Sequence, residues 1–337
     1  ELREGENEIS VTVEDMLSHI YPYGKQRIDH GGMWYTPVSG IWQTVWIESV
    51  PEKYIRNIRV TSSVSGADIE IFTDAPDAAV SIHTPEGTVE LKSSLSDKMD
   101  RHIIHADFER PENWTPENPY LYEFTVTAGK DRAESYFALR TVEVKEVDGR
   151  QRICLNGSPY FFNGVLDQGY FSDGIYTPAS YDAFRDDIAA MKKLGFNMLR
   201  KHIKVEPDIY YYLCDKLGMA VFQDMVNSGH YSFIRDTLMT NFVKLVEKRD
   251  THRPGLPERK KFFVMHCEDT LDILYDHPCI VYYTIFNEGW GQFDSDRIYT
   301  LLKQKDPTRI YDSTSGWFAQ EKSDVLSLHV YYQKITI

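Results

Sequence analysis

The chain has 337 residues, 42% of them hydrophobic and 26% charged, which is typical of a folded protein with about two or three domains. The formal net charge of −14 argues against a nucleic-acid partner, because phosphate binding requires clustered Lys and Arg, and against binding to an anionic membrane surface. No apolar stretch of the sequence is long enough to span a bilayer.

The first segment, residues 1–51, contains two stretches with the two-residue alternation of a half-buried strand. Ile9, Val11 and Val13 alternate with polar residues, and a second run extends from Ile41 to Ile47. A turn-rich stretch separates the two. Because so few strands cannot close a sandwich or barrel alone, we expect this segment to be the end of a larger all-β domain.

The second segment, residues 52–147, continues in short runs of strand-forming residues separated by turn signals such as Pro85-Glu86-Gly87. Strands are expected over Ile55–Val60, Ile69–Phe72, Val89–Lys92, Ile103–Asp107, Leu121–Thr127 and Tyr136–Glu143. This spacing predicts an immunoglobulin-like β-sandwich of about 100 residues.

The third segment, residues 148–337, alternates strands with helices, which indicates a parallel sheet with crossover helices. Strands are expected over Tyr160–Leu166, Phe196–His202, Met219–Asp224, Ile280–Phe286, Ile310–Ser313 and Val325–Val330, and helices from about Ser180, after Pro207 and over Val264–Leu274. A complete (β/α)8 TIM barrel takes roughly 250 residues and eight strands. We therefore expect an incomplete TIM barrel with about six of the eight strands, in a multidomain protein of β and α/β parts.

The sharpest chemical feature is the sequence Asn287-Glu288-Gly289-Trp290, which directly follows an apolar run typical of a fully buried parallel strand. In barrel enzymes catalytic groups lie at the carboxyl ends of the strands. A carboxylate in that position is partly desolvated, which raises its pKa and suits it to act as a general acid on a glycosidic oxygen. Asn287 can then hydrogen-bond a sugar hydroxyl and Trp290 can stack on a sugar ring, whereas an Asn-Glu pair alone would be typical of an ordinary loop.

Other polar residues fall at the ends of predicted strands. Each of them alone could equally be structural, for example an interior His paired with a backbone carbonyl. Several that converge on one barrel face are better explained as a binding pocket. We therefore predict substrate-binding roles for Asp167, His202, Asp224, His329 and Tyr331.

The four cysteines, Cys154, Cys214, Cys267 and Cys279, show no C-x-x-C spacing. This pattern argues against a zinc or redox site and favours free thiols in a reducing, cytoplasmic compartment. We expect no metal and no cofactor. A homo-oligomer of the full-length protein is compatible with the sequence.

Three stretches of the third segment resemble the barrel of glycoside hydrolase family 2, which contains β-galactosidases, β-glucuronidases and β-mannosidases. They are Leu155–Pro159 with Asn163–Val165, Leu194–Arg200, and Ile285–Glu288. Gly40–Trp46 is similar to the end of the family's jelly-roll sugar-binding domain, and Trp114–Tyr122 to its immunoglobulin-like domain.

The resemblance implies a retaining exo-β-glycosidase that acts on the O-glycosyl bonds of terminal β-linked sugars, with β-galactosides first and β-glucuronides or β-mannosides next. Glu288 matches the family's acid/base residue and Asn287 its sugar-hydroxyl partner. The family's nucleophile is a second Glu in a Glu-(Phe/Tyr)-Gly setting, and no such motif is found in this sequence. We therefore expect the chain to be truncated at both ends and inactive by itself. The alternative is a non-catalytic carbohydrate-binding or scaffold protein.

Overall fold

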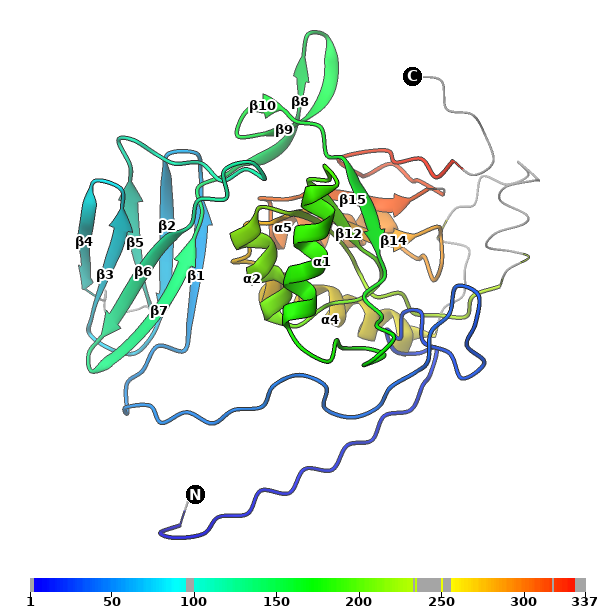
Figure 1. Ribbon diagram of the computed structural model, residues 1–337, viewed down its shortest axis with the longest axis horizontal. Helices are drawn as coiled ribbons and strands as arrows, with labels where there is room; N and C mark the ends of the chain where they lie inside the picture. The colour runs from blue at the N-terminus through cyan, green and yellow to red at the C-terminus, as the bar shows by residue number, and fades with distance from the viewer. Residues whose placement is uncertain are drawn as a thin grey trace.

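The computed structural model describes residues 3–94, 100–232, 256–316 and 318–330, together with Ile234 and Asp250. Figure 1 shows a β-sandwich beside a parallel sheet that helices cover. A small antiparallel sheet lies between them in the chain. It contains β8 (Val142–Val147), β9 (Arg150–Leu155) and β10 (Ser158–Pro159).

The sandwich consists of two antiparallel sheets. One contains β1 (Asn57–Ser62), β2 (Gly66–Phe72) and β5 (Arg101–Asp107), and the other contains β3 (Asp77–Thr84), β4 (Gly87–Ser94), β6 (Tyr122–Ala128) and β7 (Asp131–Phe137). Alternate residues of each sheet, such as Ile69 and Ile71 in β2 and Val80 and Ile82 in β3, are fully buried in a common core. The predicted β-sandwich is therefore confirmed.

Two details of the sandwich differ from the prediction. β3 was not predicted, because Ala78 and Ala79 weaken its strand signal. The strand expected over Tyr136–Glu143 is divided, since β7 ends at Phe137 and β8 begins in another sheet at Val142.

The parallel sheet contains β11 (Gly164–Asp167), β12 (Met198–Lys201), β13 (Ala220–Asp224), β14 (Ile280–Asn287) and β15 (Ile310–Ser315), paired in chain order. Its helices are α1 (Asp182–Lys193), α2 (Asp208–Leu217), α4 (Pro257–Leu274) and α5 (Ser295–Lys305), of which α5 was not predicted. All eight residues of β14 are buried, as expected for a parallel strand that is covered on both faces.

Glycines end the first two helices of this region. Gly195 follows α1 with φ of 90°, and Gly218 follows α2 with φ of 72°, a backbone conformation that residues with a Cβ rarely adopt. Each glycine reverses the chain into the next strand, so the repeated Leu-Gly pair in the sequence marks two equivalent helix-to-strand junctions.

Three expected strands do not form. Residues 9–13 and 41–47 have no strand pairing, and their apolar side chains are exposed, for example 74% for both Ile9 and Val45. Residues 325–330 run past β15 without joining the sheet, so five parallel strands are paired in the described chain rather than six. Alternation alone does not make a strand, because the backbone N–H and C=O groups also need a neighbouring ladder.

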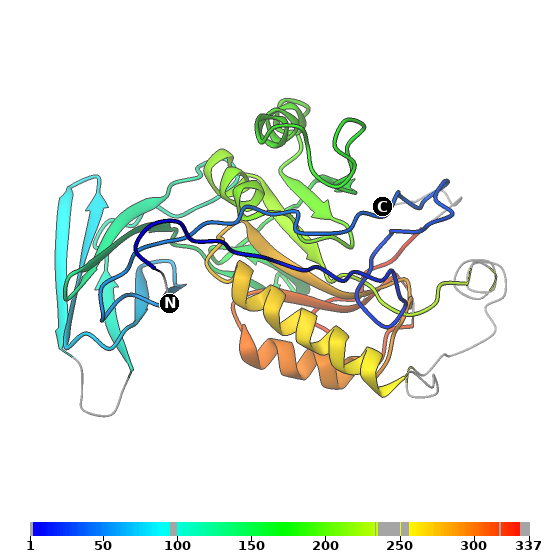
Figure 2. The ribbon, with the colours of Figure 1, turned by 90° about the horizontal axis from the view of Figure 1, so that it is seen from below.

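The N-terminal segment reaches the parallel sheet at the end away from the sandwich. Figures 1 and 2 show the chain running along the molecule, forming a loop beside the sheet, and returning in extended form to β1. The loop is anchored by hydrogen bonds from the backbone N–H groups of Tyr23 and Gly24 to the carbonyl of Asn227, both 3.1 Å. Among the described helices, none combines the length and apolar character needed to cross a membrane.

Candidate active site

The carboxyl ends of the parallel strands bring five of the predicted site residues to one edge of the sheet. Asn287 is the last residue of β14 and Glu288 follows it, while Asp224 ends β13. His202 directly follows β12, and His329 comes from the segment that runs past β15. Parallel strands all end at the same edge, so residues far apart in the sequence meet there.

Glu288 occupies a tight turn at this edge. Its φ of 54° is left-handed, and Gly289 continues the turn with φ of 68°. The Glu288 N–H donates to the carbonyl of Ser315 at 2.8 Å, and the Trp290 N–H closes the turn on the Asn287 carbonyl at 2.9 Å. A non-glycine residue in this backbone region is uncommon and is often found at functional sites.

Arg200, the third residue of β12, connects most of the predicted site. Its Nε donates to Asp224 Oδ1 at 2.9 Å, and its Nη2 donates to Asn287 Oδ1, also at 2.9 Å. Nη1 lies 3.2 Å from His329 Nε2. The guanidinium therefore fixes a carboxylate, an amide and an imidazole in one arrangement, which we call the Arg200 network.

The Arg200 network assigns the tautomer of His329. A guanidinium only donates hydrogen bonds, so His329 Nε2 must accept the one from Arg200. The proton of the neutral ring then lies on Nδ1, which is 2.8 Å from Glu288 Oε1. His329 thus donates to Oε1 of Glu288.

His202 and Asp224 form a buried pair behind this network, with 2.6 Å between His202 Nδ1 and Asp224 Oδ2. Burial alone would raise the pKa of Asp224, but Arg200 and His202 outweigh it and lower that pKa to about 2. Burial lowers the pKa of His202 despite the neighbouring carboxylate. The pair is therefore an ionised carboxylate and a neutral imidazole that donates from Nδ1.

Lys25 brings a further charge from the N-terminal loop. Gly24 packs so closely on the loops after the strands that a Cβ there would lie 2.8 Å from the Ile203 carbonyl oxygen. Burial lowers the pKa of the adjacent Lys25, and the carboxylates of Glu288 and Asp224 oppose that effect. The loop therefore contributes a half-buried cation to the same electrostatic environment.

Two other predicted residues lie apart from the Arg200 network. Asp167 Oδ2 pairs with Lys201 Nζ at 2.7 Å and accepts a hydrogen bond from the Tyr210 hydroxyl at 3.0 Å. Lys201 also pairs with the buried Glu206 at 2.9 Å, so Asp167 belongs to a second ionic cluster. Tyr331 lies outside the described residues.

Trp290 does not present an open face to the site. Its side chain is only 3% exposed and packs against the rings of Tyr23, Trp34 and Tyr231. Its indole N–H donates to the Gly229 carbonyl at 2.9 Å. The structure therefore buries Trp290, where it supports other aromatic rings, rather than exposing it on the surface where stacking was expected.

Sequence reasoning missed Arg200 and Lys25. The sequence could have indicated Arg200, because a charged residue in a strand that helices cover needs an oppositely charged or hydrogen-bonding partner. Nothing in the sequence could have indicated Lys25, since its position depends on how the N-terminal loop packs against the parallel sheet.

The site contains the carboxyl group of Glu288, hydrogen-bond donors, and an ion pair between Arg200 and Asp224. Asn287 Oδ1 accepts the hydrogen bond from Arg200, so the amide is oriented with its Nδ2 hydrogens as donors for a ligand. Within the ranges described, no group of three or more His, Cys, Asp or Glu side chains is placed to hold a metal ion. The arrangement is suited to positioning a polar ligand next to one acid.

Comparison with protein families gives two matches that together cover most of the chain. Residues 142–336 match the TIM barrel domain of glycosyl hydrolases family 2, and residues 53–140 match a second domain of glycosyl hydrolases family 2.

The chain is also similar to curated proteins along nearly its whole length. It is 25% identical to a β-galactosidase of Aeromonas hydrophila over 96% of this chain, and 25% identical to a β-galactosidase of Kluyveromyces lactis over 91%. These alignments cover 31% and 33% of the two relatives, so the chain spans about a third of their length.

Solved structures share the fold. A β-glucuronidase of Dictyoglomus thermophilum aligns with a TM-score of 0.62 at 17% identity, covering 77% of this chain and 44% of that one. A β-glucuronidase of Parabacteroides merdae aligns with a TM-score of 0.61 at 18% identity, covering 78% and 33%. The parallel sheet with its helices is therefore an incomplete α/β barrel, as predicted.

Proposed function

Because the chain belongs to glycosyl hydrolase family 2, we propose that Glu288 is the proton-donating acid of a retaining exo-β-glycosidase that removes terminal β-linked sugars. The observation that carries this proposal is the position of Glu288. It follows the buried strand β14 directly, its backbone is held in a left-handed turn, and His329 contacts one of its oxygens.

The hydrogen bonds suggest how the acid acts. While Oε1 accepts a hydrogen bond from His329, the carboxyl group of Glu288 gives its proton to the glycosidic oxygen as the bond from that oxygen to the sugar breaks. The same carboxylate then removes a proton from the water that releases the sugar. Asn287 donates from Nδ2 to a sugar hydroxyl, because Arg200 fixes the orientation of its amide.

A retaining mechanism needs a second carboxylate about 5 Å from the acid. Asp224 is ion-paired with Arg200, and Asp312 accepts hydrogen bonds from the hydroxyls of Tyr282, at 2.9 Å, and Ser327, at 2.5 Å. Burial raises the pKa of Asp312, which disfavours the ionised form that a nucleophile needs. We therefore infer that neither serves as the nucleophile. Because the sequence has no Glu-(Phe/Tyr)-Gly motif, we propose that these 337 residues alone do not hydrolyse glycosides.

The preferred substrate class is the β-galactosides, since the relatives that align with nearly the whole chain carry that name. β-Glucuronides and β-mannosides come next. The second candidate function is a non-catalytic carbohydrate-binding or scaffold protein, which the engagement of Asp224 and Asp312 with other groups favours.

Binding of basic sugar analogues tests the proposal without requiring turnover. The basic nitrogen of an iminosugar takes up the proton of Glu288 and, as an ammonium, pairs with the carboxylate that remains. Accordingly, 1-deoxygalactonojirimycin should bind more tightly than its gluco- and manno-configured counterparts. Glu288→Gln should weaken binding at least about tenfold, as expected when a charged hydrogen bond is lost. Glu268→Gln, on α4, is the matched control and should leave affinity unchanged. Equal affinity of wild type and Glu288→Gln would favour the non-catalytic alternative.

A further inference from the structure

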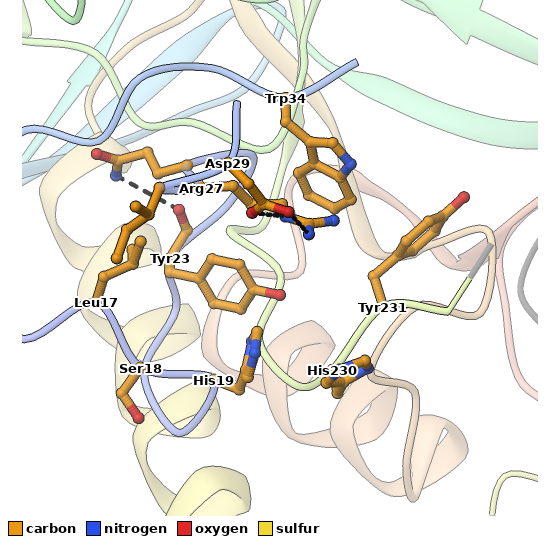
Figure 3. Close-up of a pocket in the computed structure, with 11 residues that line it drawn as sticks. Leu17, Ser18, His19, Tyr23, Arg27, Asp29, Trp34, His230 and Tyr231 are labelled. Atoms are coloured by element: carbon orange, nitrogen blue, oxygen red, sulfur yellow. Dashed lines mark hydrogen bonds and ion pairs between the residues drawn. The ribbon is translucent and has the colours of Figure 1, made fainter. Parts of the chain in front are cut away.

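A separate pocket lies between the N-terminal loop and the chain after β13. Figure 3 shows its walls, which come from residues 17–34 on one side and from His230 and Tyr231 on the other. Its volume is about 220 Å³, below the roughly 300–1,000 Å³ that drug-sized ligands occupy, so it is suited to a single ring. None of its lining residues belongs to the Arg200 network.

Aromatic rings in fixed positions form one part of the pocket. Trp34 and Tyr231 meet edge to face with their centroids 5.2 Å apart, and both are partly exposed. Both also pack against the buried Trp290, while Tyr23 is held by a hydrogen bond from its hydroxyl to the Gly229 carbonyl at 2.9 Å. Rigid aromatic faces can receive the C–H face of a sugar at little entropic cost.

A charge-balanced pair forms the polar part. Arg27 donates from Nε and Nη2 to the two carboxylate oxygens of Asp29, at 3.0 and 2.5 Å, and its guanidinium lies 5.0 Å from the centre of the Trp34 ring. Asp29 is 75% exposed, so the pair lies at the solvent side of the pocket. The donors of Arg27 and the acceptors of Asp29 lie side by side, as do the neighbouring hydroxyl groups of a sugar. Because the two charges cancel, the pair favours neither an anionic nor a cationic ligand.

Two imidazoles complete the wall. The rings of His19 and His230 have their centroids 5.0 Å apart. Burial, together with the neighbouring His230 and Arg27, lowers the pKa of His19 and keeps it neutral near pH 7. A neutral imidazole both donates and accepts a hydrogen bond, which again suits hydroxyl groups.

We propose that this pocket binds one uncharged sugar ring, as a carbohydrate site separate from the one that Glu288 serves. The inference goes beyond the proposed hydrolysis and does not depend on it, because it rests on the aromatic rings, the Arg27–Asp29 pair and the two imidazoles alone.

Saturation-transfer NMR titration of the whole chain with methyl β-galactoside, methyl β-glucoside and glucuronate tests the proposal. At least one methyl glycoside should bind more tightly than glucuronate. Arg27→Met and, on the opposite wall, His230→Ala should each weaken that binding at least about fivefold, the order expected when one hydrogen-bonding partner is lost. Arg56→Met is the matched control, because Arg56 forms a similarly exposed pair with Asp74 on the sandwich. It should bind like the wild type.

The possible outcomes separate the two sites. Binding that survives Asn287→Ala but is weakened by both pocket variants supports the pocket, even if Glu288 proves not to be an acid. Binding that Asn287→Ala abolishes while both pocket variants bind normally overturns the pocket and leaves the Glu288 proposal standing. Absence of binding by either methyl glycoside, or tighter binding of glucuronate, would also overturn it.

Discussion

At the scale of single residues, Arg200 determines the geometry of the site more than any carboxylate does. It contacts Asp224, Asn287 and His329 with three different nitrogens, and only 18% of its side chain is exposed. The position of the acid therefore depends on a residue that does not contact it directly, because Arg200 acts on Glu288 through His329.

Replacing Arg200 by Met should both destabilise the fold and impair the site. The buried carboxylate of Asp224 would lose its ionic partner, and such a loss costs about 3–5 kcal/mol of unfolding free energy. Urea denaturation measures that change, and iminosugar affinity measures the effect on the site. Arg185→Met, which removes an exposed pair with Asp182, should change stability by less than about 1 kcal/mol. If Arg200→Met also changed the unfolding free energy by less than about 1 kcal/mol, the Arg200 network would not stabilise the fold as proposed.

The sequence identified several of these residues but not their partners. Asn287, Glu288, Asp224 and His202 lie at strand ends as predicted, because the topology of parallel strands brings those ends together. His329 reaches the same edge although the strand on which its prediction was based does not form. The same rule selected Asp167, which instead pairs with Lys201. The length and charge of neighbouring side chains decide such pairings, and a strand pattern does not contain that information.

At the scale of secondary structure, elements with strong local signals were predicted well. The apolar face of α1, which buries Phe184 and Ile188, and the apolar run of β14 are strong local signals for a helix and a buried strand. Residues 9–13, 41–47 and 325–330 show the alternation of a strand, but strand formation depends on a partner supplied elsewhere in the chain. β3 is the opposite case, since pairing with β4 and β6 overrides its weak alanine-containing sequence.

His277, in the loop between α4 and β14, shows how elements are tied together by a titratable group. Its Nδ1 lies 2.7 Å from Asp215 and its Nε2 lies 2.9 Å from Asp208, both in α2. Burial would lower its pKa, but the two carboxylates outweigh that effect and raise the pKa to about 10. His277 is therefore protonated at neutral pH and links α2 to the start of β14.

This raised pKa predicts a pH dependence of stability. The contribution of His277 should be fully present below its unfolded pKa of about 6.5 and should be lost as the pH rises through 10. Urea unfolding at several pH values from 6 to 10.5 should show the wild type losing stability relative to His277→Gln. The exposed His30→Gln variant is the control and should follow the wild type. Parallel pH profiles of wild type and His277→Gln would show that the ion pairs contribute nothing.

At the scale of the whole molecule, the sandwich and the barrel share buried contacts. Trp114, which precedes β6, is fully buried in the barrel core and donates its indole N–H to the Asp215 carbonyl at 2.9 Å. Arg140, after β7, donates to the carbonyls of Pro278 and Ile280, both at 2.8 Å. These contacts predict that the two parts unfold together.

Trp114→Ala tests this coupling. Removing a buried indole should cost about 3–5 kcal/mol, and calorimetry should then show a lower or divided transition where the wild type shows one. Trp46→Ala is the matched control, because Trp46 is 71% exposed and its loss should leave the transition unchanged. Two separate transitions in the wild type itself would refute the coupling.

The central claim is that this chain supplies the acid of a β-glycosidase while its nucleophile is not among the residues described. Addition of azide to the chain with 4-nitrophenyl β-galactoside tests it most directly. We predict no release of nitrophenol without azide. With azide, which attacks the sugar carbon while Glu288 protonates the departing oxygen, α-galactosyl azide should form, and Glu288→Gln should suppress it. Azide-dependent turnover that is equal in wild type and Glu288→Gln, or any hydrolysis without azide, would contradict the account.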